Sequence, residues 1–324
     1  MIRKLVPAAL AALVLTLAPA PAPAADGTFE RTLRVTGAVD LHVVTGSGDI
    51  TVRRGAAGAV TVRGAITANR SWGTAGDPLA AVRQLEQQPP VVQEGNTIRV
   101  GPLDEDVARR VSVSYDITVP ESTGLNARSG SGDIVAEGVG LGVQLQTGSG
   151  SVRCTDLGGG VSASAGSGDL AFDGVGGALD ASTGSGSIRA SRVAGAVKAH
   201  TGSGDVTVSV TGQGVVAVSA ASGDVEVTGA KSAVDVRSAS GDVTVDGAPG
   251  GAWSVESASG DVSLRLPADA KFSLDAHSTS GRIDVGGLPV TVSGVISRRE
   301  LKGDVRGGGP RIDVRTSSGD VTIR

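Results

Sequence analysis

Apolar residues recur at alternate positions along most of this chain, in short runs separated by glycine. In one stretch they are Leu170, Phe172, Val175, Leu179 and Ala181. Eighteen residues later the same offsets hold Ile188, Ala190, Val193, Val197 and Ala199. Apolar pairs two residues apart are typical of strands with one buried face, and the intervening glycines indicate turns. Each unit therefore predicts two short strands and two turns, and no helix.

A Ser-Gly dipeptide, usually followed by Asp and an aliphatic residue, marks the same point of every unit. Its glycines lie at positions 48, 132, 150, 168, 186, 204, 223, 241, 260, 281 and 319. From Gly132 to Gly281 the steps are 18, 18, 18, 18, 19, 18, 19 and 21 residues, and we interpret the last step of 38 as two units of 19. Short strands bury one face only by stacking on equivalent strands, so this period indicates a solenoid.

The repeat predicts an all-β fold, a right-handed parallel β-solenoid with coils of about 18 residues. Stacked coils lie about 4.8 Å apart, so the steps from Gly132 to Gly281 would span roughly 38 Å. A left-handed hexapeptide helix also has coils of this size. Its apolar positions recur every six residues, which the offsets here do not.

Both ends depart from the period. We expect residues 25–122 to form N-terminal strands and a small helix-containing cap, continuous with a solenoid at 123–324. Because open solenoid ends need covering, a cap is favoured over a catalytic domain. A glycine-rich interruption near 288–310 predicts a hairpin or loop, after which the chain finishes on "SSGDVTIR".

One helix is predicted within the cap, at "DPLAAVRQLEQQ". Asp77 suits the N-cap and Pro78 the first turn. Its apolar face consists of Leu79, Val82 and Leu85. Strands are expected at 91–100 and 111–119 from the alternation of their apolar residues.

The first residues have the pattern of an export signal. Arg3 and Lys4 precede an apolar run of fourteen residues and then small residues suited to cleavage. A membrane-spanning helix needs about twenty apolar residues. We therefore expect residues 1–24 to be a signal peptide, with Ala25 as the alternative cleavage point and no transmembrane segment in the remaining chain. The protein would be exported to the periplasm, the cell surface or the extracellular space.

Charge and cysteine content narrow the classes of partner. The predicted signal holds two of the 29 basic residues and none of the 33 acidic ones, which leaves 27 minus 33, or −6. Without a basic tract, nucleic acid is not an expected partner. Cys154 is the single cysteine, which excludes an internal disulfide and indicates a buried core thiol.

The order of these elements resembles a known family. An export signal, "GSGDITV", a short helix, "VSYDITVP", tandem "SGDV" units and a final "SSGDVTIR" are similar to the bacterial β-strand-repeat family labelled "putative adhesin", a domain of unknown function. The resemblance covers roughly Thr28 to Arg324. It implies an exported, solenoid-like domain of the cell envelope, and it brings no catalytic residues.

The recurring Gly-Asp dipeptide raises the possibility of calcium, because calcium-binding β-rolls use Gly- and Asp-rich repeats. Here only one edge of each coil has the motif, and Ser151, Ser187 and Arg282 replace the aspartate. Calcium prefers six to eight oxygens. Stacking predicts one candidate cation row: Asp205, Asp224, Asp242 and Asp261. Neighbours in it would repel by about 0.9 kcal/mol even at the dielectric of water, so a loosely bound cation stays an alternative.

A structural role for the motif is the favoured interpretation. Ser and Asp both accept hydrogen bonds from turn amides, which explains their exchange. Serine precedes the glycine in all eleven copies. We therefore predict a stacked hydroxyl ladder inside the turn, formed by Ser149, Ser167, Ser185, Ser203, Ser222, Ser240 and Ser259.

The remaining candidates for chemistry are few. His200 and His277 each lie three residues before an anchor serine, and four coils, or about 19 Å, would separate them, too far to share a metal. His42 is expected on a strand surface. No grouping of His, Cys and carboxylates suggests zinc or Cys-His chemistry, so no catalytic residues and no cofactor are predicted. Aromatic residues that bind sugars are scarce: the Trp and Tyr residues are Trp72, Tyr115 and Trp253.

The sequence thus predicts a non-enzymatic, exported envelope protein, an adhesin or scaffold whose repeated surface binds a glycan or protein by avidity. A cation- or glycan-binding module of the same fold is the alternative, and a polysaccharide-cleaving β-helix a remote one. End-to-end self-association is a further hypothesis, because "GDVTIR" would end the solenoid on an uncovered strand.

Overall fold

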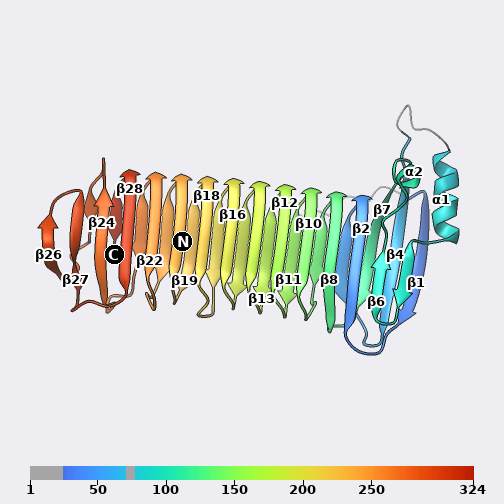
Figure 1. The fold of residues 1–324 in the computed structure, drawn as a ribbon, viewed down its shortest axis with the longest axis horizontal. Helices are drawn as coiled ribbons and strands as arrows, with labels where there is room; N and C mark the ends of the chain where they lie inside the picture. Colours follow the sequence, from blue (N-terminus) through green and yellow to red (C-terminus); the bar gives the residue numbers. More distant parts are fainter. Residues whose placement is uncertain (1–24, 71–76) are drawn as a thin grey trace, which may run out of the picture.

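The computed structural model describes residues 25–70 and 77–324, in which two long sheets face each other along a rod (Figure 1). The predicted signal peptide and Trp72 lie outside the described residues. Sheet A consists, in spatial order, of β1 (Gly27–Arg34), β4 (Ala59–Ala68), β7 (Val111–Val119), β3 (Ile50–Arg54), β9 (Ile134–Glu137), β11 (Val152–Leu157), β13 (Leu170–Val175), β15 (Ile188–Val193), β17 (Val206–Val210), β19 (Val225–Ala230), β21 (Val243–Gly247), β23 (Val262–Arg265), β29 (Val321–Ile323) and β25 (Ile283–Asp284).

Sheet B is built in the same way. It consists of β26 (Val290–Ile296), β27 (Glu300–Val305), β24 (Phe272–Ser278), β28 (Arg311–Ser318), β22 (Trp253–Ser259), β20 (Val234–Ser240), β18 (Val216–Ser222), β16 (Val197–Ser203), β14 (Leu179–Ser185), β12 (Val161–Ser167), β10 (Val143–Ser149), β8 (Thr123–Ser131), β2 (Val39–Ser47), β6 (Thr97–Val100) and β5 (Val91–Glu94). The prediction of an all-β, solenoid-like fold is confirmed. The right-handed winding stays a prediction.

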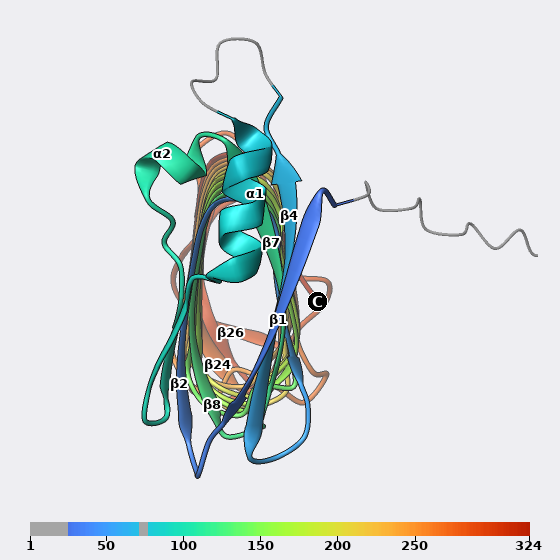
Figure 2. The same ribbon diagram turned by 90° about the vertical axis from the view of Figure 1, so that its right-hand side faces the viewer.

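Each coil contributes one strand to sheet B and the next to sheet A, so equivalent residues pair in parallel. Val143 pairs with Val161, which pairs with Leu179. Seen along the rod the coils form a narrow oval (Figure 2), and alternate Val, Ile, Leu and Ala side chains fill it. Cys154 lies within this core, 1 % exposed, as predicted, and burial raises the pKa of its thiol to about 12.

The anchor glycine forms the corner at which the chain passes from sheet B to sheet A. Ten of the eleven have φ between +122° and +154°, a region that side chains disfavour. A Cβ on Gly186 would also lie 2.2 Å from the carbonyl oxygen of Gly168, the anchor one coil earlier. Glycine is therefore required both by the local conformation and by the distance between coils.

The N-terminal end is capped by α1 (Pro78–Gln87), which contacts β1, β4 and β7. The Asp77 side chain accepts a hydrogen bond from the Leu79 amide, as expected of an N-cap. The buried face of the helix is Ala81, Val82 and Leu85, whereas Leu79 is 44 % exposed. The prediction that Leu79 belongs to the buried face was wrong, and Ala81 is buried in its place.

Residues 55–70 and 77–122 belong to a segment that separates two adjacent coils in the sequence. β2 and β3 pair directly with β8 and β9, with Ser47 opposite Ser131 and Ile50 opposite Ile134. The strands expected at 91–100 and 111–119 are the β5–β6 hairpin and β7. A four-residue helix that the sequence did not reveal, α2 (Glu105–Ala108), precedes β7.

The C-terminal end differs from the sequence interpretation. β28 lies between β22 and β24, and β29 lies between β23 and β25, so the coil latest in sequence is inserted between two earlier ones. Gly319 is therefore one coil from Gly260, and the step of 38 was wrongly interpreted as two coils beyond Gly281. "GDVTIR" is not an uncovered edge. The antiparallel β26–β27 hairpin, at 290–305, reverses the chain and makes the insertion possible.

Replacing the corner glycine tests the distance between coils. Gly186→Ala should lower the free energy of unfolding by about 2 kcal/mol, because backbone strain at such angles costs 1–3 kcal/mol before any clash. Gly95→Ala is the matched control, since Gly95 has φ of +64° but open space around it. That variant should lose about 1 kcal/mol. Equal losses in denaturant titrations would contradict a role for coil contact.

Candidate functional site

The aspartates of the anchor motif join successive coils through the backbone. Asp205 Oδ1 accepts a hydrogen bond from the Asp224 amide at 3.0 Å, and Asp224 accepts from the Asp242 amide at 2.8 Å. All eight anchor aspartates make this contact: Asp49, Asp133, Asp169, Asp205, Asp224, Asp242, Asp261 and Asp320. The acceptor role was predicted from the Asp-Ser exchange, but the amide belongs to the next coil rather than to the same turn.

The hydroxyl row lies two residues before the predicted one. Thr147, Thr183 and Thr201 point inward, and each donates to an anchor glycine carbonyl one coil earlier, at 2.9–3.0 Å. The predicted serines do pair in register, but their side chains are exposed and make no hydrogen bond within residues 25–70 and 77–324. They are Ser149, Ser167, Ser185, Ser203, Ser222, Ser240 and Ser259. The strand alternation explains the offset, because the residue two before the serine faces the core.

The candidate cation row is a continuous column. Asp205, Asp224, Asp242 and Asp261 occupy consecutive coils, and Asp320 extends the row because of the inserted coil. One oxygen of each carboxylate is already bound to a backbone amide. No group of three or more His, Cys, Asp or Glu suited to a metal occurs in the described parts of the chain. Cation binding by this row stays a prediction.

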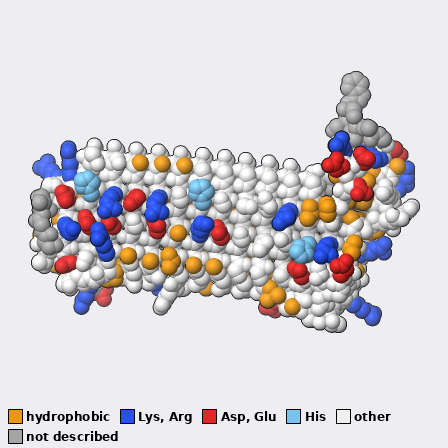
Figure 3. Space-filling model, in the orientation of Figure 1, with side chains coloured by type: hydrophobic (Ala, Val, Ile, Leu, Met, Phe, Trp, Pro, Cys, Tyr) orange, Lys and Arg blue, Asp and Glu red, His pale blue; other side chains and the backbone are white. Residues whose placement is uncertain are grey.

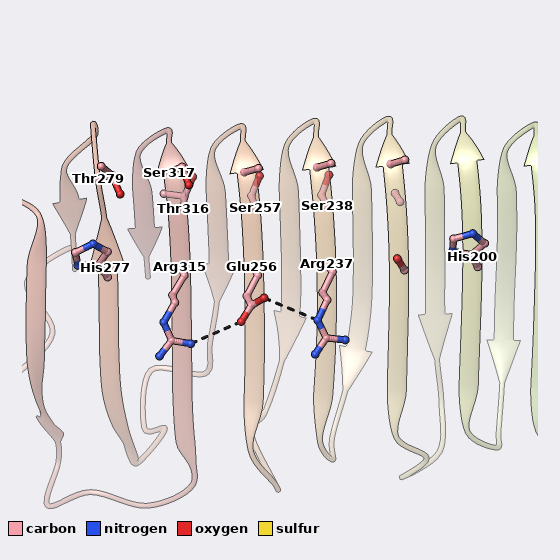
Figure 4. A pocket seen from close by; sticks show the side chains of 15 residues that line it. His200, Arg237, Ser238, Glu256, Ser257, His277, Thr279, Arg315, Thr316 and Ser317 are labelled. Atoms are coloured by element: carbon pink, nitrogen blue, oxygen red, sulfur yellow. Dashed lines mark ion pairs between the residues drawn. The ribbon is translucent and has the colours of Figure 1, made fainter.

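A second row of side chains crosses the outer face of sheet B (Figure 4). Parallel pairing places six residues side by side on consecutive strands: His200, Ser219, Arg237, Glu256, Arg315 and His277. The inserted β28 separates the two histidines by five strand steps rather than the four predicted. They remain too far apart to share a metal, as expected. His42 lies apart, beside Asp40 at 3.0 Å.

Ion pairs connect the middle of this row. Glu256 lies between two arginines, 3.8 Å from Arg237 Nε and 3.6 Å from Arg315 Nη1. Arg237 also contacts Asp235 at 2.9 Å, and Arg315 contacts Asp313 at 2.9 Å. These arginines are half exposed or more, and such surface pairs contribute at most about 1 kcal/mol. A ligand group could therefore replace them at little cost.

Beside the charged row runs a shallow groove of about 610 Å³, which we call the sheet B groove. Its lining includes the exposed methyl groups of Ala221, Ala239 and Ala258. The equivalent position in the preceding coils is glycine: Gly130, Gly148, Gly166, Gly184 and Gly202. This groove lies in the C-terminal half of the rod, where Figure 3 shows hydrophobic and charged side chains on this face.

Two hydroxyls in the groove lining lack partners. Ser238 and Ser257 are 6 % and 5 % exposed, and their oxygens make no hydrogen bond to the described residues. Buried polar groups are normally paired. The sequence could not reveal this, because equivalent hydroxyls such as Thr201 are bonded to the backbone.

On sheet A the most strongly perturbed charge cluster joins three coils. Arg192 donates to Asp173 at 2.8 Å and reaches Asp156 at 3.1 Å. Gly174 lies between them, and a Cβ there would be 2.7 Å from the Asp156 carboxylate. Hydrogen bonds from Arg192 and then Ser191 lower the pKa of Asp173 from 3.8 to about 2. The cluster connects coils, and it lies on the sheet opposite the groove.

The geometry defines a class: a two-sheet parallel β-solenoid with a repetitive polar surface. The Toastrack DUF4097 family model matches residues 87–246 and again 161–324, and the chain belongs to this family. The resemblance seen in the sequence is thereby confirmed. A comparison with curated proteins gives no match.

Solved structures of similar proteins share the fold at low sequence identity. They include a "putative lipid binding protein" from Parabacteroides distasonis (11 % identity, 92 % of this chain and 98 % of that one, TM-score 0.42). A "putative adhesin" from the same organism has 10 % identity, the same coverage and a TM-score of 0.37. A "putative cell adhesion protein" from Clostridium sporogenes has 11 % identity, covers 91 % and 98 %, and has a TM-score of 0.23.

The aspartate column can be tested by removing one charge. Asp224→Asn keeps an oxygen acceptor and removes repulsion, so the melting temperature should rise by about 1–3 °C. Asp224→Ala loses the acceptor and should lower it. Calorimetric titration of the wild type with calcium should give no heat. Heat that disappears in Asp224→Asn would instead support a cation site.

The Asp173 cluster predicts a particular acid response. Because the folded pKa is depressed, the stability from this carboxylate is complete above pH 3.8 and is lost as the pH falls through about 2. Arg192→Gln should return the pKa towards its ordinary value, measured by carbon-detected NMR titration. Lys198→Gln, which removes the Asp180 ion pair, should leave the pKa of Asp173 unchanged.

Proposed function

We propose that this protein is an exported, non-enzymatic component of the cell envelope that binds an extended partner in the sheet B groove. The observation that carries the proposal is the alignment of six outward side chains, from His200 to His277, beside a strip of exposed methyl groups. Parallel stacking turns single residues into a row about 24 Å long, a length suited to a linear ligand. Family membership agrees with an adhesin-like role.

The composition of the groove lining favours binding over catalysis. The groove lining holds one carboxylate, Glu256, whereas glycoside hydrolysis uses a pair.

Among the described residues no helix is long and apolar enough to cross a membrane. Export, proposed from residues 1–24, would place the groove in contact with envelope polymers or proteins.

A glycan is the second candidate partner, and the Trp and Tyr residues that the structure describes argue against a stacking mode. Trp253 and Tyr115 are 1 % and 2 % exposed, and the Trp253 indole donates to the Ser232 carbonyl at 2.8 Å. Sugar recognition would therefore depend on polar contacts from Arg237, Glu256 and Arg315.

Binding of residues 25–324 to isolated envelope fractions and to a glycan array tests the proposal. The double variant Arg237→Glu/Arg315→Glu should weaken binding at least tenfold, equivalent to about 1.4 kcal/mol. The matched control is Arg153→Glu/Arg189→Glu, because these arginines are also two strands apart, on sheet A. Its affinity should stay within twofold of wild type.

Loss of binding in both double variants would indicate general charge attraction and contradict a groove. Unchanged binding in the groove variant would place the partner elsewhere. Groove-dependent binding on the array would identify a glycan, whereas binding confined to protein-containing fractions would identify a protein.

A further inference from the structure

The two ends of the rod are protected to different degrees. At the N-terminal end, the edge strand of sheet A is β1, which exposes Glu30, Arg31 and Arg34, and α1 packs beside it. The edge strand of sheet B is β5, which has four residues and ends in Glu94. Charges, short length and a covering helix are the usual means of preventing edge pairing.

At the C-terminal end, one strand has no charge and, within the described chain, no covering helix, and its register against β27 shifts between Val292 and Ile296. β26, Val290–Ile296, is the outermost strand of sheet B and has β27 as its single neighbour among the described residues. Its seven residues, VTVSGVI, contain no charge and no proline, and five are β-branched. Such a segment at an open edge readily pairs with another strand.

The neighbouring edge of sheet A is already occupied. The turn of the β26–β27 hairpin folds across it, where the Ile283 amide donates to the Arg298 carbonyl and the Ser278 amide donates to the Arg299 carbonyl, both at 2.9 Å. β25 is also only two residues long. β26 is therefore the strand at which the rod, as far as the structure describes it, can be extended.

We propose that β26 pairs with β26 of a second copy, antiparallel and about a two-fold axis, so that two rods join at their C-terminal ends. The other edge strands do not match β26, since β5 is shorter and β1 is charged. An uncharged edge strand of the same length is offered by β26 of a second copy. The adjacent arginines determine the direction. Parallel pairing would place Arg298 and Arg299 beside their own equivalents, whereas antiparallel pairing moves them to opposite ends of the interface.

The symmetry also limits the assembly. A contact of β26 with the N-terminal end of another copy would repeat without closing and build a filament. The charged edge and α1 oppose that contact. Pairing of β26 with itself uses up the open edge of both copies, so assembly stops at the dimer. This proposal concerns the end of the rod and is independent of what the sheet B groove binds.

Sedimentation equilibrium of residues 25–324 at micromolar concentrations tests the dimer. The wild type should have twice the mass of one chain, and Thr291→Lys should halve it. Thr291 is exposed and pairs with Asp304 on β27, so the new lysine faces an opposite charge and the hairpin should persist. Thr207→Lys is the matched control, since Thr207 is exposed on the internal strand β17 and its variant should remain dimeric.

Hydrogen exchange of the wild type provides a measurement that does not depend on a variant. Amides of β26 that point away from β27 should be protected at high protein concentration and lose protection on dilution, while those of β20 remain unchanged. A monomer at all concentrations, or a dimer unaffected by Thr291→Lys, would overturn the proposal. Species larger than a dimer would overturn the two-fold arrangement.

Discussion

The close approach of successive corner glycines is the contact on which this structure depends. A Cβ on any of Gly150, Gly168 and Gly186 would lie 2.0–2.2 Å from the glycine carbonyl oxygen one coil earlier. Because the corners approach this closely, a side chain at the glycine position has no room between successive coils. Equivalent residues pair in register in both sheets, and the aspartate and threonine hydrogen bonds join the coils in that register. The glycine of the repeat is therefore required mainly for steric reasons, and the hydrogen bonds of the aspartates are a second contribution.

Fixed register has a direct effect on the surface. Every outward position becomes a line of side chains about 4.8 Å apart, so one substitution per coil changes a whole strip of the rod. The exchange of glycine for alanine at 221, 239 and 258 is such a change, and it adds a strip of methyl groups to the lining of the groove. The charged row beside it arises in the same way from Arg237, Glu256 and Arg315. The character of each surface strip is thus determined by the residues at one position of successive coils rather than by loops.

The sequence predicted the features that repeat and missed those that depend on topology. The strands, the corner at Gly186 and the N-cap Asp77 follow from local patterns. The insertion of β28 and β29 does not, because "SSGDVTIR" has the same anchor whether its coil lies at the end or between two others. The groove was hidden for a related reason: Arg315 and Glu256 are 59 residues apart in sequence yet adjacent in sheet B. Predicting that the Thr201 hydroxyl points inward required knowing which side chains of its strand face the core.

The inserted coil also determines the order in which the C-terminal strands can pair as the chain is synthesised. β24 cannot acquire its parallel neighbour in sheet B until residues 311–318 have been made, because β28 occupies the place between β24 and β22. A chain that has emerged only as far as the β26–β27 hairpin therefore lacks the strand that lies between β22 and β24 in the complete rod. Until that strand has been made, the C-terminal end of the rod is incomplete. The rod can grow from its capped end coil by coil, but it closes by the late entry of a strand between two that precede it.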